Sequence, residues 1–277
     1  AKIANRTYLE VSKSLRDGLE AGLILPIDSS FKWVYEDADS NIDQGYPPSY
    51  VFVHDKIQQA FYTTLSNEKQ MKNHQLIGLE LVYLYGKAEL KSHIFEIVNH
   101  LNQSRVLLTE KQKLNLIEWN WMAGERAKNR AASESALNFF RIGKELLPEK
   151  RWSAAYYPLT FKIMTGLGEA EYLNHLFQEA ENTFEEILIN AKTIQEKLQI
   201  YDLKILLNVH IHEVEKATNA GLEGLSLGGW NFKSNATKMD VAKEYLLTKL
   251  ALRKKKETDL LQLPVVEDKL VHALMRT

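Results

Sequence analysis

The sequence predicts a mainly α-helical chain, in which an irregular solenoid of helical hairpins follows a small α/β unit. The chain has only six prolines, and none lies in residues 49–147 or 159–263, so helices can run through both stretches without the break that a proline ring imposes. From residue 55 almost to the end, apolar residues recur at the three- and four-residue spacing of a helix that buries one face. Six prolines and 13 glycines are below the usual shares, which excludes collagen-like and disordered chains.

The first 66 residues are predicted to form the α/β unit. Apolar residues over 8–19 lie on one face of a helix, and Gly22 follows as a stop signal. The spacing then changes to three short runs of β-branched and aromatic residues, at 23–27, 31–35 and 50–53. Such runs, separated by turn-forming residues, favour the strands of a small hairpin. A helix followed by a hairpin is typical of a winged helix, so we expect a winged-helix-like unit with a long polar loop at 36–49.

Residues 67–277 are predicted to form the helical repeats. Three residue types recur at a displacement of 44 residues: Gly124 and Gly168, Ala136 and Ala180, Phe140 and Phe184. In a tetratricopeptide-type hairpin, the glycine lets two helices approach, the alanine fills their crossing, and the aromatic ring plugs the gap to the next hairpin. A weaker third unit places Ala217 in the alanine position, 37 residues beyond Ala180. The unequal displacements predict an irregular tetratricopeptide-like α-solenoid rather than a regular array.

Charge and composition exclude several classes of partner. The 35 basic and 36 acidic residues give a formal net charge of -1, so no overall field attracts the chain to nucleic acid or to an anionic membrane. The absence of cysteine excludes disulfides and cysteine-ligated zinc. No apolar run reaches the roughly 20 residues of a membrane span, and the first residues lack the apolar segment of a signal peptide. We therefore expect a cytoplasmic protein with neither nucleic acid nor membrane as a partner and, because it begins without methionine, a piece of a longer chain.

The sequence lacks the motifs of a catalytic, cofactor or metal site. Neither of its Gly-Lys pairs has the upstream glycine of a phosphate-binding loop. His210 and His212 are two residues apart, a spacing that points their rings to different sides of a helix. His93 and His100 could share a face, but no carboxylates complete a metal-ligand set near them. We expect no catalytic residue, no cofactor and no metal in this chain.

Two tryptophans are candidates for partner binding. Trp119 and Trp121 flank Asn120 in the first helix of the Gly124 repeat. One indole is expected to pack inward and the other to lie near the rim of a groove. Packing in the core and binding of a partner are both open interpretations, because a tryptophan serves either purpose.

Five segments in order resemble a family of large bacterial signalling proteins. Residues 50–62 resemble the motif F-x-H-D-x-x-Q-x-A-x-Y, which follows the NTPase module of proteins that join a serine/threonine-kinase-like or STAND-class NTPase region to a sensor histidine kinase. Four later segments resemble further motifs of that family: FEIVNHLN at 95–102, AGERAK at 123–128, EAEYL at 169–173 and LQLPVVED at 261–268, the last with Val266 where methionine is usual. The resemblance covers about residues 7–277.

The resemblance implies a regulatory piece of a multidomain protein. It places the ATP-binding core upstream and the kinase output downstream, so the chain itself is expected to be non-catalytic. In STAND proteins a winged-helix histidine can contact the phosphates of the nucleotide, and His54 is the position that matches. The alternative interpretation is that His54 or Asp55 caps the following helix.

The leading hypothesis is therefore a regulatory scaffold whose concave helical surface binds protein, either flanking domains of the same polypeptide or a signalling partner. A DNA-binding winged-helix regulator with a helical sensor domain is the alternative, although the candidate recognition helix over 8–19 carries mixed charges rather than a basic face. We also expect a homodimer through the last helix, roughly 265–275, which presents apolar Val266, Leu270 and Leu274. The competing prediction is that this stripe packs back onto residues 245–250.

Overall fold

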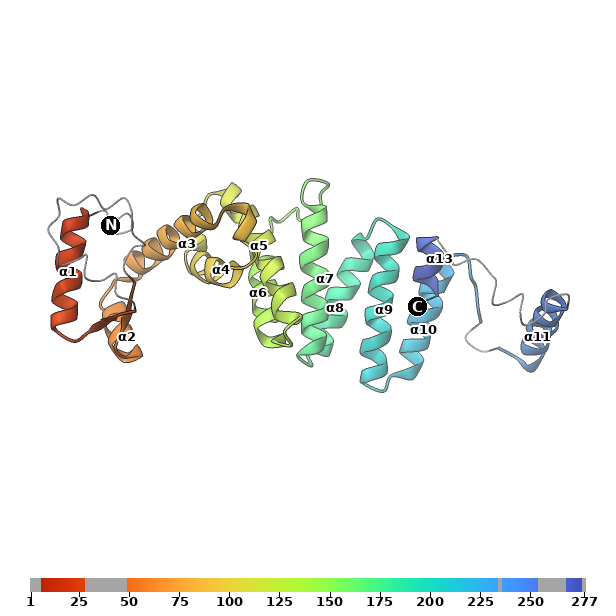
Figure 1. Ribbon diagram of the computed structural model, residues 1–277. Helices are drawn as coiled ribbons and strands as arrows, with labels where there is room; N and C mark the ends of the chain where they lie inside the picture. Colours follow the sequence, from red (N-terminus) through yellow and green to blue (C-terminus); the bar gives the residue numbers. More distant parts are fainter. Residues whose placement is uncertain (1–5, 28–48, 234–235, 254–267, 276–277) are drawn as a thin grey trace. The chain divides into compact units, whose positions relative to one another are not determined.

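The computed structural model describes residues 6–27, 49–233, 236–253 and 268–275. Over these residues the chain is mainly helical with one two-stranded sheet, which confirms the predicted class of an α-helical repeat-like fold with a small α/β unit (Figure 1). The chain forms two compact units, Ala1–Lys113 and Leu114–Thr277. The sequence predicts a boundary after residue 66. The contacts instead group the helices between residues 67 and 113 with the sheet.

The first unit opens with helix α1 (Tyr8–Glu20) and a small sheet. Thr7 and Glu10 form a capping box at the start of α1, in which the Thr7 amide donates to the Glu10 carboxylate at 2.8 Å. The helix ends before Gly22, which has a φ of 66° that favours glycine. Strands β1 (Ile24–Pro26) and β2 (Tyr50–Phe52) then pair antiparallel, with Leu25 opposite Val51. The expected strand at 31–35 and the expected loop, except for its last residue, lie outside the described residues.

Three helices and a short 3₁₀ turn complete the first unit. They are α2 (Asp55–Thr63), α3 (Asn67–Glu89), α4 (Ile94–Gln103) and the turn η2 (Arg105–Leu107). Helix α3 is interrupted at Gly86, where φ is 53° and ψ is -163°. Helix α4 packs closely on α3 because Gly78 has no side chain: a Cβ there would lie 2.5 Å from Leu101. The buried side chains of α4, including Ile97 and Val98, form the core of this unit.

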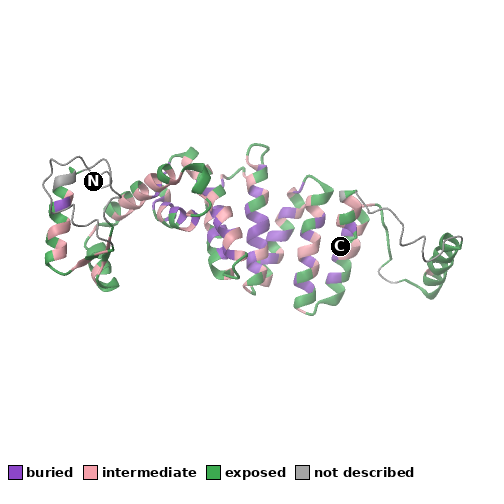
Figure 2. Ribbon diagram, viewed as in Figure 1, coloured by how far each residue is buried: buried purple, intermediate pink, exposed green. Residues whose placement is uncertain are grey.

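The second unit contains a run of helices that pack on their neighbours, followed by two further helices. They are α5 (Glu110–Lys128, whose first turn belongs to the first unit), α6 (Ser133–Leu146), α7 (Tyr157–Leu173), α8 (Phe177–Asn190), α9 (Ile194–His210), α10 (Val214–Leu227), α11 (Lys238–Leu252) and α13 (Lys269–Leu274). Neighbours from α6 to α10 pack on one another, and α7 also contacts α9. Buried residues therefore lie along the centre of α5 to α9 (Figure 2).

The turns inside the three hairpins have the same backbone geometry. Ala131, His175 and His212 have φ values of 57°, 61° and 63°. In each turn the amide of the next residue donates to a carbonyl five residues earlier, and the three distances are 3.0, 2.9 and 2.8 Å. The three turns follow one another at 44 and 37 residues, the displacements found in the sequence. The positions of Ala136, Ala180 and Ala217 are thus equivalent in the structure, five residues after each turn residue.

The repeated glycines and phenylalanines meet one another. A Cβ on Gly124 would lie 2.6 Å from the ring of Phe140, and one on Gly168 would lie 2.5 Å from the ring of Phe184. Gly166 on α7 also faces the Phe140 ring, so this ring fills the space between its own hairpin and the next. Phe140 and Phe184 are fully buried. In the third hairpin the large and small residues are exchanged between the two helices. Ile205 on α9 occupies the glycine position, and Gly221 on α10 occupies the aromatic position.

The last helix does not pack back onto α11. Helix α13 packs on α9, and its Leu274 is 3% exposed and contacts Gly228. Tyr245 and Leu250, the proposed acceptors on α11, are 65% and 62% exposed, so the prediction that α13 packs back onto them is wrong. Leu274 instead occupies the space that a side chain at position 228 would fill, next to Gly228. Val266 lies outside the described residues, and self-association stays a prediction.

Candidate protein-interaction surface

Two side-chain bridges join α5 and α7 and define one face of the second unit. Lys162 on α7 places its Nζ 4.5 Å from the ring centroid of Trp121 on α5. Lys128 on α5 places its Nζ 2.7 Å from Glu169 Oε2 on α7. Both pairs are 41 residues apart, so they lie in one register along the two helices. We call these four residues the α5–α7 face.

The charge on Lys128 is held in place at this face. Burial alone would lower the pKa of its ammonium group, but the hydrogen bonds that Lys128 donates to Glu169 and Glu125 outweigh burial and raise the pKa. The Lys128 side chain is only 16% exposed. A charge that is mostly buried and paired on both sides is costly to disturb. Lys128 therefore fixes the spacing of α5 and α7, whereas Lys162 is exposed.

Thr165 lies on the same side of α7, three residues after Lys162 and four before Glu169. Its residue is 7% exposed. Within the part of the chain that the structure describes, its Oγ1 atom has no hydrogen-bond partner. A buried hydroxyl without a partner is unfavourable, so this position has hydrogen-bonding capacity that the described residues do not use.

The tryptophans differ from the sequence expectation in one respect. Trp119 and Trp121 are both half-buried, so neither packs fully inward as one of them was expected to do. The fully buried residue is Asn120 between them, whose amide donates to the Leu116 carbonyl at 2.9 Å. Trp121 contributes to the α5–α7 face, whereas Trp119 lies elsewhere around the helix.

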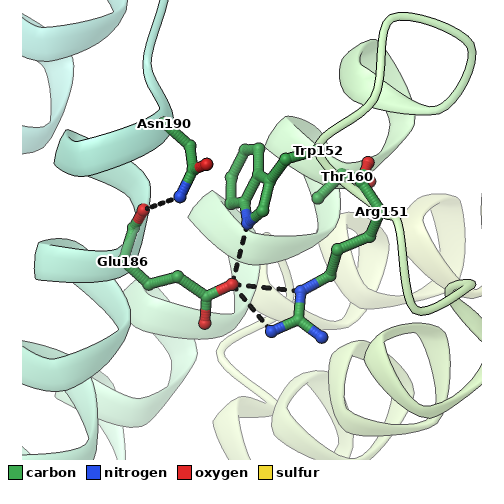
Figure 3. Close-up of polar contacts among 5 residues, drawn as sticks. All are labelled: Arg151, Trp152, Thr160, Glu186 and Asn190. Carbon is green, nitrogen blue, oxygen red and sulfur yellow. Dashed lines mark hydrogen bonds and ion pairs between the residues drawn. The ribbon is translucent and has the colours of Figure 1, made fainter.

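A second polar cluster fixes the long loop between α6 and α7 to α8. Arg151 donates from Nε and Nη2 to Glu186 Oε1 at 3.0 and 2.8 Å, and Trp152 Nε1 donates to the same oxygen at 2.9 Å (Figure 3). Thr160 donates to the Arg151 carbonyl at 2.7 Å, and Asn190 donates to the Glu186 carbonyl at 2.8 Å. Burial alone would raise the pKa of Glu186. The hydrogen bonds donated by Trp152 and Arg151 lower the pKa by more than burial raises it, so the net shift is downward.

Tyr157 extends this cluster to the turn before α9. Its hydroxyl donates to Glu196 Oε2 at 2.8 Å and accepts the Lys192 amide at 2.9 Å. The Lys192 Nζ lies 3.9 Å from the Tyr157 ring centroid, and the Trp152 ring lies 5.9 Å away. The loop residues therefore form a hydrogen-bonded cluster of aromatic and charged groups at one end of the hairpins.

The histidines on α9 and its turn have separate environments. His210 packs among rings, with Phe177 at 5.6 Å and Tyr172 at 5.7 Å between centroids. His212 occupies the turn position with a φ of 63°. The structure therefore separates the two rings.

His54 caps helix α2. Its Nδ1 accepts the Lys56 amide at 3.1 Å, while Asp55 is the first residue of the helix. The side chain is exposed. Of the two expected capping residues, His54 is thus the one that accepts a helix amide.

The sequence analysis missed a histidine pair in the first unit. His100 lies with its Nδ1 atom 2.8 Å from Nδ1 of His74, 26 residues earlier on α3. His93, which the sequence placed on a common face with His100, instead stacks on Tyr85 at 3.6 Å. The sequence does not predict either contact, because the partners in each lie on different segments and are not one helical turn apart.

Metal and membrane sites were also sought among the described residues. No group of three or more His, Asp or Glu side chains there could hold a metal ion. None of the described helices combines the length and the apolar character that a membrane crossing requires. The α5–α7 face offers charged groups and an indole, which are groups suited to binding.

Comparison with known proteins gives one informative match. No family model matches the chain, and no solved structure matches it. The hybrid signal transduction histidine kinase G of Dictyostelium discoideum is 28% identical over 178 residues. This match covers 55% of the chain but 5% of the kinase, so the chain spans only a small part of the length of that protein.

Proposed function

We propose that the chain is a non-catalytic regulatory and protein-interaction scaffold from a multidomain signal-transduction kinase. The similarity to a hybrid histidine kinase associates the chain with signal transduction, and the repeat-like helical fold suits a binding surface. In this proposal the scaffold couples an upstream nucleotide-binding module to a downstream kinase output. The winged-helix-like and tetratricopeptide-like descriptions belong to the same proposal.

The observation that carries the proposal is the α5–α7 face. Lys162 covers Trp121 through a cation–π contact, which contributes about 0.5–1 kcal/mol at an exposed site. An acidic side chain on a partner would attract Lys162 and uncover the indole, and tryptophan is enriched among residues that dominate binding energy. The partner that fits is an acidic segment with an apolar side chain, from a flanking domain or another protein.

His54 is the candidate for nucleotide sensing in the intact protein. Its exposed ring at the start of α2 leaves Nε2 open to a group from outside the chain. A phosphate at a helix start also gains from the helix dipole. This role requires the upstream module and is absent from the chain by itself.

The test is the kinase output of the intact protein with Trp121→Ala. Trp230→Ala is the matched control, because Trp230 is 42% exposed and follows α10, away from α5 and α7. We expect Trp121→Ala to change the rate of autophosphorylation at least threefold, and Trp230→Ala to leave it unchanged. Equal rates for all three proteins would contradict the assignment of the surface.

DNA binding is the alternative outcome, and its test is separate. Helix α1, the candidate recognition helix, carries Glu10, Lys13, Arg16, Asp17 and Glu20. Phosphate contact requires a basic bias that this set lacks. Salt-dependent binding of the chain to mixed-sequence duplex DNA at physiological ionic strength would favour this alternative.

A further inference from the structure

Helix α11 (Lys238–Leu252) carries apolar side chains that the described residues leave uncovered. No residue of α11 is buried. Seven large apolar residues of this one helix are exposed: Met239, Val241, Tyr245, Leu246, Leu247, Leu250 and Leu252. Single exposed apolar residues are ordinary on a protein surface, whereas a contiguous group of them marks an interaction site. Helix α11 is therefore a candidate binding segment.

Six of these residues form two stripes on nearly opposite sides of the helix. The first stripe contains Met239, Leu246 and Leu250, which lie within about 40° of one another at 3.6 residues per turn. The second stripe contains Val241, Tyr245 and Leu252, and its centre lies about 140° around the helix from that of the first. A helix that is apolar on more than one side is normally buried on more than one side. A partner that covers both stripes must therefore enclose α11 rather than lie against one face.

The charges of α11 favour an acidic partner. Lys249 and Arg253 lie in the narrower gap between the two stripes. Asp240 is already paired, because Lys233 Nζ donates to its Oδ1 atom at 2.9 Å. Over residues 238–259 the sequence has seven basic and four acidic residues. An acidic rim around an apolar groove would complement this excess of positive charge.

The helix gains little stability from its own fold. A capping box begins it, in which the Thr237 amide donates to Asp240 Oδ2 at 2.9 Å and the Asp240 amide donates to Thr237 Oγ1 at 3.2 Å. The helix has 15 residues, and isolated helices shorter than about 12–15 residues are marginal in water. Because none of its residues is buried, a partner that buries the stripes would also stabilise the helix itself.

We propose that α11 is the docking segment for an acidic calcium-sensing protein, whose apolar grooves enclose the helix from both sides. Such sensors bind Ca²⁺ through carboxylates, and Ca²⁺ opens their helix pairs to expose an apolar groove rich in methionine. A target helix lies in such a groove through apolar residues spaced by whole turns, as in each stripe of α11. The inference goes beyond the proposed scaffold role, because it concerns a different helix from the α5–α7 face and a partner outside the polypeptide.

Two other covers fit α11 less well. A second copy of the helix would cover one stripe and leave the other in water. A membrane surface takes a helix with a single apolar face, so it would also leave one stripe in water. An enclosing protein is the cover that buries both.

Calorimetric titration of the full chain with calmodulin tests the proposal, with calmodulin as the probe for this class of partner. We expect a one-to-one complex in Ca²⁺ and at least a hundredfold weaker binding in EGTA, which closes the grooves. The affinity should also fall as salt is added, because opposite charges meet at the rim. Absence of binding in Ca²⁺, or equal binding in EGTA, would overturn the proposal.

Three variants locate the binding site. Leu246→Gln and Tyr245→Gln each remove one apolar anchor, one from each stripe, and each should weaken binding at least about tenfold. Leu206→Gln on α9 is the matched control, since Leu206 is 54% exposed and Leu246 is 58% exposed, and it should bind as the parent chain does. All three positions are exposed, so the variants should keep the circular dichroism spectrum of the parent. Weakening by only one of the two α11 variants would contradict enclosure from both sides.

The two other covers are tested with the chain and no calmodulin. Sedimentation measures self-association, and flotation measures binding to vesicles of phosphatidylcholine and phosphatidylserine. The proposal predicts that Leu246→Gln changes neither. A dimer that becomes a monomer in Leu246→Gln, or vesicle binding that this variant abolishes, would assign α11 to one of the other covers and overturn the proposal.

Discussion

Phe140→Ala tests the packing of the first two hairpins. The ring is fully buried and lies between Gly124 on α5 and Gly166 on α7, so its removal opens a cavity bordered by three helices. Large-to-small substitutions of buried phenylalanine cost about 3–5 kcal/mol in free energy of unfolding. We expect a loss in this range, because the glycines opposite have no side chain with which to fill the space.

A second substitution, Gly124→Ala, makes this test specific, because its effect on the free energy of unfolding should change sign when the Phe140 ring is removed. In the parent chain, a Cβ at Gly124 would lie 2.6 Å from ring atoms of Phe140, and such overpacking costs about 1–3 kcal/mol. Alanine is favoured over glycine inside a helix by about 1 kcal/mol, which offsets part of that cost. Once Phe140→Ala has removed the ring, only the helical preference remains. Gly124→Ala should therefore destabilise the parent chain and stabilise the Phe140→Ala variant.

Urea denaturation followed by tryptophan fluorescence measures both effects, since Trp119, Trp121, Trp152 and Trp230 lie in the second unit. Gly168→Ala is the matched control. Its Cβ would meet Phe184 at 2.5 Å rather than Phe140, so it should destabilise both backgrounds alike. If Gly124→Ala had the same effect with and without the Phe140 ring, the proposed packing of these hairpins would be refuted.

Three further predictions concern two carboxylates and the activity of the chain. At pH 7, Glu186→Gln should lower the free energy of unfolding by about 1–3 kcal/mol, since it weakens charged hydrogen bonds, and the difference should fade below pH 4.5, the usual pKa that Trp152 and Arg151 hold Glu186 beneath. Glu171→Gln should instead raise the free energy of unfolding at neutral pH, because burial raises the pKa of Glu171 and the folded chain favours its protonated form. Urea titrations at pH 7 and in acid distinguish the destabilisation expected for Glu186→Gln from the stabilisation expected for Glu171→Gln. The isolated chain should not hydrolyse ATP, and phosphate release that survives purification and is lost in His54→Ala would contradict this.

The repeat could be predicted from the sequence because its packing depends on residue size at fixed helical positions. Gly124 and Phe140 recur as Gly168 and Phe184, and each small residue faces the large one of its own hairpin. The local start of α2 was also within reach, since a polar side chain before an apolar helix is a capping signal. His54 fills that position.

The contacts between distant segments could not be predicted in the same way. Arg151 meets Glu186 only because the loop before α7 folds back over α8, and loop length alone does not set that direction. His74 and His100 are joined across two helices whose crossing is set by Gly78. The fate of the last helix was missed for a similar reason, because the fit of Leu274 against Gly228 depends on backbone positions 46 residues apart.

The central claim is that the α5–α7 face binds protein in a longer signalling polypeptide. Hydrogen exchange of that polypeptide, compared peptide by peptide with the isolated chain, tests it most directly. The account predicts slower exchange in the polypeptide for the peptides that carry Trp121 and Lys162, and unchanged exchange for the exposed helix α11. Equal exchange of α5 and α7 in both proteins would contradict the claim.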